Sequence, residues 1–106
     1  MPKYLLQASY TPQGVEGVRT KGGSSRRDAV AEAVSSVGGQ VESFHFGFGD
    51  EDSYVVVDLP DNEAAVALAL TVNAAGGATL KTIPLLTPEE VDEAANRSVD
   101  YRPPGS

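Results

Sequence analysis

Hydrophobic and polar residues alternate most regularly in residues 41–59. In the first half of this stretch, aromatic residues occupy every second position: Phe44, Phe46 and Phe48. In the second half, aliphatic residues do the same: Val55, Val57 and Leu59. A period of two is typical of strands with two unlike faces. The pattern predicts a hairpin with strands over residues 41–48 and 53–59, in which the phenylalanines lie opposite valines on one face.

Two further strands are predicted over residues 3–10 and 79–86. In the first of them, Tyr4, Leu6, Ala8 and Tyr10 alternate with Lys3, Leu5, Gln7 and Ser9. The second set carries the hydrogen-bonding groups, so we assign it to the face of the sheet that also bears His45. That face is expected to carry the following side chains: Gln7, Ser9, Ser43, His45, Tyr54, Val56 and Asp58.

Two helices are predicted between the first strand and the hairpin. Thr11 can cap a short helix that starts at Pro12 and ends near residues 21–23. A second helix is expected to start at Ser24 or Ser25, with Asp28 three residues after Ser25 in a capping arrangement. Glycine is typical of the position just after a helix, so this helix should end at residues 38–39.

Two more helices follow the hairpin. Asp61 or Asn62 can cap a helix over residues 63–75. Thr87, followed by Pro88 and by a glutamate three positions after the threonine, is a strong helix start, and this last helix should run to about residue 96. Residues 63–75 are apolar on nearly all sides, which indicates contacts with the sheet and with either another subunit or another segment of the chain.

The order of these elements is β-α-β-β-α-β plus a short C-terminal helix. This order predicts a ferredoxin-like α+β fold, with a four-stranded antiparallel sheet and the helices on one face. Residues 1–96 are expected to form a single domain, and residues 97–106 a loose tail. The open sheet face and the apolar helix need cover, so we expect a homo-oligomer, most simply a two-fold dimer.

The composition excludes several classes of function. The 106 residues carry a formal charge of −7, and a surface of that sign disfavours nucleic acid as a partner. The sequence contains no cysteine, which excludes disulfides and thiol chemistry. We expect no membrane association and a cytoplasmic location, because no apolar run is long enough for a signal peptide or a transmembrane helix.

His45, the only histidine, is the centre of the best candidate site. Asp58 could orient its imidazole as an acid/base pair, and Tyr54 could hold a substrate oxygen, which would make these three residues catalytic. Three neighbours on the same face could bind a ligand: Gln7, Ser9 and Ser43. Alternatively, His45 is a polar residue in an interface between sheets, hydrogen-bonded to a partner chain.

Two weaker sites have charged residues close together. A possible anion site at the start of the second helix consists of Ser24, Ser25, Arg26 and Arg27. The alternative is a joint between helices with solvated charges. Residues 50–52 place three carboxylates in one turn, which could hold calcium or form a solvated turn. We expect no metal and no cofactor within one chain, although a symmetric site using His45 from two chains stays open.

Several short motifs resemble the GYD-domain family of small bacterial proteins over roughly residues 3–95. They are Pro2-Lys3-Tyr4-Leu5, Thr11-Pro12-Gln13-Gly14, Gly22-Gly23-Ser24, Gly38-Gly39, Phe46-Gly47-Phe48-Gly49 and Asp58-Leu59-Pro60-Asp61. Glu51 stands where the family name leads us to expect a tyrosine. The resemblance implies a relation in fold to dimeric α+β barrel proteins, in which two sheets pack open face to open face. Some of those relatives are cofactor-free oxygenases or isomerases, and others only bind.

Two classes of function follow. The first is an oligomeric module that binds a small molecule on the open sheet face without catalysis. The second is a cofactor-independent enzyme of the oxygenase or isomerase kind, which would use His45 and Asp58. A deep, partly apolar pocket beside His45 would favour the enzyme, and a dry contact between subunits would favour the module.

Overall fold

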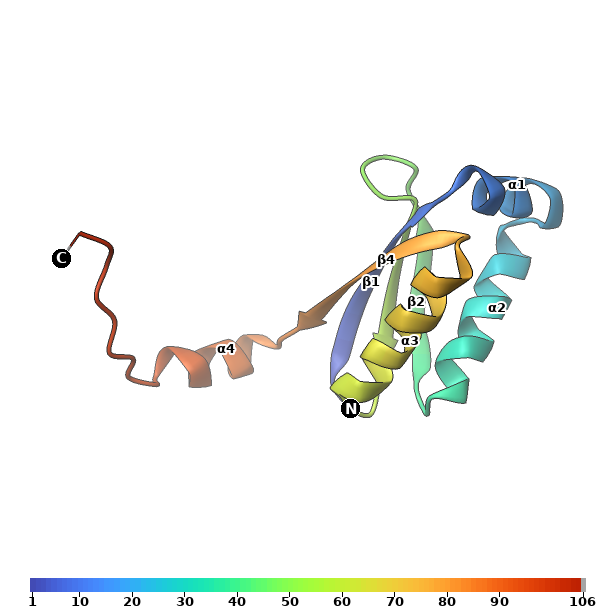
Figure 1. Ribbon diagram of the computed structural model, residues 1–106. Coiled ribbons are helices and arrows are strands. Elements are labelled where there is room, and N and C mark those ends of the chain that lie inside the picture. The colour runs from blue at the N-terminus through green and yellow to red at the C-terminus, as the bar shows by residue number, and fades with distance from the viewer. Residues whose placement is uncertain (106) are drawn as a thin grey trace.

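A computed structural model describes residues 1–105, and within that range four strands form one antiparallel sheet. They are β1 (Lys3–Tyr10), β2 (Gln40–Phe46), β3 (Ser53–Asp58) and β4 (Ala78–Leu85). The strand order is β2-β3-β1-β4, so β2 and β4 are the edges of the sheet (Figure 1). The predicted element order and the antiparallel four-stranded sheet are confirmed.

Four helices connect or follow the strands in the described part of the chain. They are α1 (Pro12–Lys21), α2 (Gly23–Ser36), α3 (Asn62–Ala75) and α4 (Pro88–Ala95). Figure 1 shows α2 and α3 side by side on one face of the sheet, as predicted. Among residues 1–105, no helix has the length and apolar composition that crossing a membrane requires.

The capping residues at three of the four helix starts are confirmed. The side chain of Thr11 accepts a hydrogen bond from the N–H of Gly14, and Asp61 caps α3 in the same way. Thr87 and Glu90 form a reciprocal capping box. The predicted cap of α2 is wrong, because this helix starts at Gly23 with no side-chain cap. Only Gly22 separates α1 from α2, so no loop is left in which a serine could cap the new helix.

The hydrophobic core lies between the sheet and helices α2 and α3. The sheet contributes the inward side chains of β1 and β3, and each helix adds small or branched residues. The buried cluster is Tyr4, Leu6, Val34, Val55, Val57, Leu59, Ala64, Ala65 and Leu68. Val57 and Leu59 are completely buried. The core side of the predicted alternation in β1 and β3 is therefore confirmed.

The hairpin pairs Phe44 with Val55, as predicted, but Phe46 lies opposite Ser53 instead of a valine, and the first strand is shorter than expected. The strand ends at Phe46 because the N–H of Gly47 donates to the carbonyl of Asp52 and closes the loop. Phe48 therefore lies outside the sheet, with a φ of 52° and an exposed fraction of 58%. Its ring stacks on Phe46, at a centroid distance of 5.5 Å, instead of entering the core.

Both edge strands are irregular. In β2, the pairing with β3 shifts register between Val41 and Ser43, as in a β-bulge. In β4, Pro84 lies opposite Tyr4 and has no N–H to donate. Bulges and prolines are typical of edge strands, because they interrupt the row of hydrogen-bonding groups along the edge.

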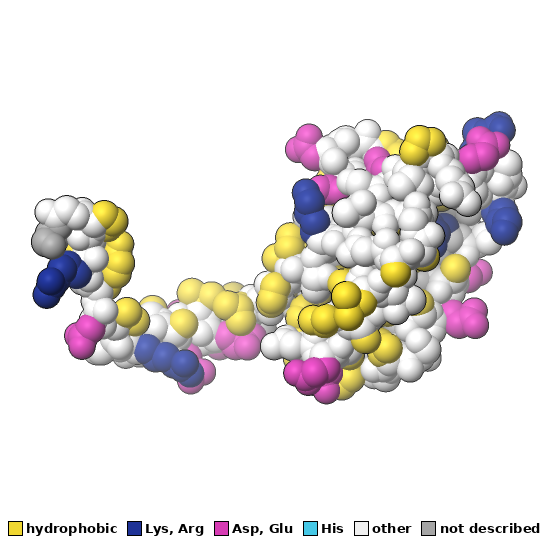
Figure 2. Space-filling view, viewed as in Figure 1, with side chains coloured by type: hydrophobic (Ala, Val, Ile, Leu, Met, Phe, Trp, Pro, Cys, Tyr) yellow, Lys and Arg dark blue, Asp and Glu magenta, His cyan; other side chains and the backbone are white. Residues whose placement is uncertain are grey.

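The last helix forms as predicted but stands away from the body of the molecule. Figure 1 shows β4 leading out of the sheet and α4 extending into solvent, and the molecule is 55 Å long in this direction. None of the residues of α4 is buried. Hydrophobic side chains are visible along this arm in Figure 2, and those at Leu86, Val91, Val99 and Tyr101 are exposed. We call residues 86–105 the C-terminal arm.

Candidate functional site

The open face of the sheet places three of the candidate residues in one row. His45 of β2 lies opposite Tyr54 of β3, and Tyr54 lies opposite Gln7 of β1. Directly opposite residues have Cβ atoms about 5 Å apart, so their side chains can share one ligand. Ser43 lies in the next row, opposite Val56. The predicted face of all these residues is confirmed.

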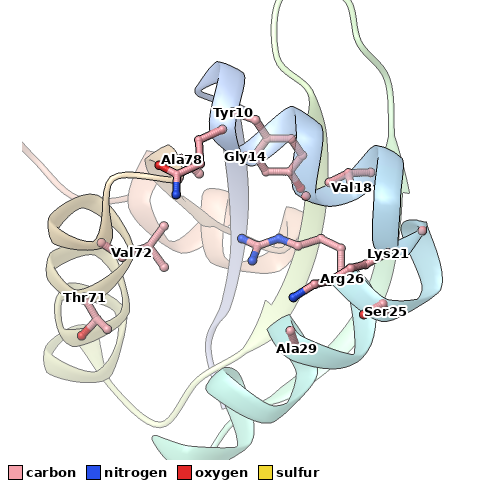
Figure 3. Close-up of a pocket in the computed structure, with 15 residues that line it drawn as sticks. Tyr10, Gly14, Val18, Lys21, Ser25, Arg26, Ala29, Thr71, Val72 and Ala78 are labelled. Carbon is pink, nitrogen blue, oxygen red and sulfur yellow. The ribbon is translucent and has the colours of Figure 1, made fainter.

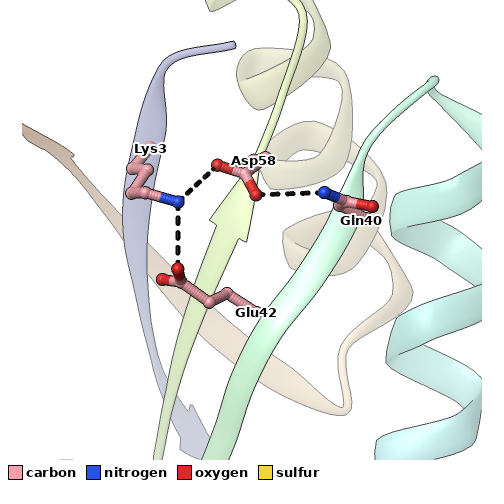
Figure 4. A network of polar contacts seen from close by, with 4 residues as sticks. All are labelled: Lys3, Gln40, Glu42 and Asp58. Carbon is pink, nitrogen blue, oxygen red and sulfur yellow. Dashed lines mark hydrogen bonds and ion pairs between the residues drawn. The ribbon is translucent and has the colours of Figure 1, made fainter.

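Asp58 is on the same face but is engaged elsewhere. Its carboxylate accepts hydrogen bonds from the Nζ of Lys3, at 2.8 Å, and from the Nε2 of Gln40, at 3.4 Å (Figure 4). Asp58 is four residues from Tyr54, the cross-strand partner of His45, which corresponds to about 13 Å along a strand. The predicted acid/base pair of His45 and Asp58 is therefore wrong in its geometry.

The charges around Asp58 also fix its protonation. The hydrogen bond from Lys3 lowers the pKa of Asp58, and the same contact raises the pKa of Lys3. Lys3 also bonds Glu42 at 3.0 Å. These pairs hold Asp58 ionised at neutral pH as a cross-strand ion pair between β1 and β3. His45 lies exposed on the edge strand, and no Asp or Glu among residues 1–105 forms an ion pair with it.

Ser9 forms a hydrogen bond with a residue of the hairpin loop. Its hydroxyl donates a hydrogen bond to Glu51, whose other carboxylate oxygen lies 2.5 Å from the Nζ of Lys81. Glu51 is only 7% exposed, so the expectation of a solvated acidic turn is wrong at this position. The neighbouring Asp52 accepts a hydrogen bond from the N–H of Tyr10 at 2.7 Å. Within residues 1–105, no three His, Cys, Asp or Glu side chains are grouped so that they could hold a metal ion.

Glu51 should make the stability of the protein depend on pH. The hydrogen bonds from Lys81 and Ser9 lower its pKa in the folded state below the unfolded value of about 4.3. The unfolded chain therefore binds this proton first, so the stabilisation is complete above that unfolded pKa and is lost as the pH falls through the folded pKa. We expect the stability difference between wild type and Glu51→Gln to shrink as the pH falls from 7 to about 3, measured by urea unfolding.

Asp50→Asn is the matched control for this measurement. Asp50 is exposed and lies in the same loop, so the substitution removes the same charge without removing the bonds to Ser9 and Lys81. Its stability should follow the wild-type pH profile closely. A Glu51→Gln profile that also runs parallel to wild type down to acid pH would contradict the role given to Glu51.

The four residues of the predicted anion site do not stay together. Ser25 and Arg26 line a cavity between α1, α2 and α3, with a volume of about 480 Å³ (Figure 3). Ser24 is not part of the lining, and Arg27 pairs with Asp28 at 3.4 Å on the exposed side of α2. The cavity also includes Tyr10, which the sequence reasoning did not select. Tyr10 follows Tyr4, Leu6 and Ala8 at every second position of β1. This alternation indicates that its side chain lies on the helix side of the sheet, so the sequence contained a signal for it.

The comparisons with known proteins address the family. The family model of the GYD domain matches residues 4–95. Neither the comparison with curated proteins nor that with solved structures gives a match. The matched residues run from the second residue of β1 to the end of α4. The chain belongs to the GYD-domain family.

Proposed function

We propose that this protein is a non-catalytic oligomeric module, in which the open sheet face packs against a second copy of the chain. The observation that supports this proposal is a row of apolar side chains across three strands: Val56, Leu5 and Ile83 are direct neighbours on the open face. Polar rows flank it, one with His45 and Tyr54 and the other with the ion pair of Lys3 and Asp58. An apolar centre with a polar rim is typical of protein interfaces.

The C-terminal arm supports a second copy as the partner. Helix α4 has eight residues, and isolated helices of that length are marginal in water. Leu86 and Val91 stay exposed on the arm of a single chain. In a two-fold dimer each chain supplies both an arm and an open face, so one symmetric contact can cover both surfaces twice.

A small molecule held between the two sheets is the binding function that fits this assembly. The row of His45, Tyr54 and Gln7 would supply its hydrogen bonds at the rim of the apolar centre. The enzymatic alternative relied on Asp58 to orient His45, and Asp58 is bonded to Lys3 instead. The geometry therefore favours binding over acid–base catalysis.

The test is the mass of the particle in solution. We expect wild type at micromolar concentration to have twice the chain mass of 11.0 kDa in size-exclusion chromatography with light scattering. Ile83→Glu should reduce it to the mass of a single chain, because it places a charge in the apolar row of the interface.

Val15→Glu is the matched control, because Val15 on α1 is 42% exposed and Ile83 is 39% exposed. This substitution adds the same charge to an equally exposed apolar site outside the proposed interface, so the dimer should persist. A wild-type particle of one chain mass would overturn the proposal. An Ile83→Glu particle that remains as large as wild type would place the interface elsewhere.

A further inference from the structure

A cavity on the helix side of the sheet has the features of a binding site. Its walls come from α1, α2 and α3 and from the end of β1, and its volume of about 480 Å³ is in the range of small-molecule sites. It lies on the opposite side of the sheet from the row of His45, Tyr54 and Gln7. The proposed dimer contact therefore leaves it accessible.

The charge of this cavity differs from that of the whole chain. The sequence has 15 acidic and 8 basic residues, yet within the described range no Asp or Glu lines the cavity. Lys21 and Arg26 do line it. Neither of these cations has a carboxylate within 4.0 Å among residues 1–105, whereas Lys3, Arg27 and Lys81 are all paired. The cavity therefore concentrates positive charge without a counter-ion from the protein.

The side chain of Arg26 extends into the cavity. Figure 3 shows its guanidinium group pointing from α2 toward Val72 of α3, beside the ring of Tyr10. The Cζ atom lies 5.5 Å from the centre of that ring, which is a cation–π distance. The Nε atom is buried and has no hydrogen-bond partner among the described residues. Buried N–H groups are nearly always paired, so the unpaired Nε shows that the protein does not use the full hydrogen-bonding capacity of Arg26, whose outer nitrogens face the cavity (Figure 3).

The shape of the guanidinium group and the walls around it narrow the class of ligand. A guanidinium group offers two parallel N–H groups that match the two oxygens of a carboxylate. Apolar side chains form much of the remaining wall: Val18, Ala29, Val72 and Ala75. We propose that the cavity binds a small organic carboxylate, with its charged end on Arg26 and Lys21 and its apolar body between α1 and α3.

The experiment is a titration with benzoate and with hexanoate, followed by NMR chemical shifts at low ionic strength. Two neighbouring variants test the site: Arg26→Gln inside the cavity and Arg27→Gln outside it. Both lose one positive charge at the start of α2, so general attraction of anions changes equally. We expect Arg26→Gln to weaken binding at least about tenfold, because it removes a charged hydrogen bond, and Arg27→Gln to change it by less than about twofold.

Two further probes test the two halves of the proposed ligand. Benzyl alcohol keeps the apolar body without the charge, and inorganic phosphate keeps the charge without the body. Both should bind at least about tenfold more weakly than benzoate. Ile83→Glu should bind benzoate like wild type, since it alters only the opposite side of the sheet. This separates a failure of the cavity proposal from a failure of the dimer proposal.

Several outcomes would overturn the proposal. One is the absence of saturable binding of both carboxylates to the wild type, and another is an equal loss in Arg26→Gln and Arg27→Gln. Phosphate binding as tight as benzoate binding would show that the apolar body contributes nothing, which would contradict an organic carboxylate as the ligand. If thermal unfolding shows that Arg26→Gln does not fold, the affinity of Arg26→Lys for benzoate is the deciding measurement. It keeps the charge but loses the planar fork, so wild-type affinity in that variant would reject the assignment.

Discussion

Replacing Leu59 with alanine is expected to lower the free energy of unfolding by about 2–5 kcal/mol. Leu59 is 0% exposed and belongs to the core cluster between the sheet and the helices. Its backbone is held in place, because its N–H donates to the carbonyl of Pro2 at 3.0 Å. The surrounding structure is expected to fill only part of the space that the side chain leaves. A small domain has only about 5–15 kcal/mol of stability, so the loss should be large.

Leu70→Ala is the matched control for Leu59→Ala. The chemical change is the same, but Leu70 lies on the outer side of α3 and is 67% exposed. Its effect should stay within about 0.5 kcal/mol. Urea unfolding of both variants, at the same protein concentration, measures the difference. Equal losses in the two variants would contradict the position of Leu59 in the core.

Replacing Gly14 with alanine is expected to destabilise the protein by about 1–3 kcal/mol or more. A Cβ atom at this position would overlap the carbonyl oxygen of Gly77, which is backbone and cannot rotate away. The two segments are also tied together, because the N–H of Thr11 donates to the same oxygen at 3.1 Å. Moving α1 away to relieve the overlap would break that hydrogen bond.

Gly17→Ala is the same substitution one turn later in α1, and it should have the opposite sign. A Cβ atom built at Gly17 meets no atom within 4 Å, so no contact opposes it. Alanine is favoured over glycine inside a helix by about 0.5–1 kcal/mol. The two melting temperatures should therefore move in opposite directions. A stabilising effect of both substitutions would show that α1 does not approach Gly77 closely.

Local signals in the sequence were sufficient for most of the fold. Thr11, Asp61 and Thr87 mark helix starts, because a cap depends only on residues within one turn. Strand parity likewise depends on the order of residues alone, so the face of His45 and of Tyr54 was predicted correctly. The family resemblance, confirmed over residues 4–95, agrees with this local information.

The candidate site was harder to predict, because its contacts join distant parts of the chain. Asp58 binds Lys3, a residue 55 positions earlier, and parity says which face a side chain is on but not how far along the strand its partner lies. Glu51 is paired with Lys81, which is 30 positions later in the sequence. The cavity around Arg26 results from the packing of three helices, and no residue pattern within one helix indicates that space.

The irregular edges of the sheet have a consequence for how copies of this chain can join. A regular edge strand could pair with the edge of another sheet and continue it without limit, as in an amyloid fibril. Here β2 carries a register shift between Val41 and Ser43, and β4 contains Pro84, so neither edge offers an uninterrupted ladder. Continuation of the sheet from one molecule to the next is thereby disfavoured, even where the protein is concentrated.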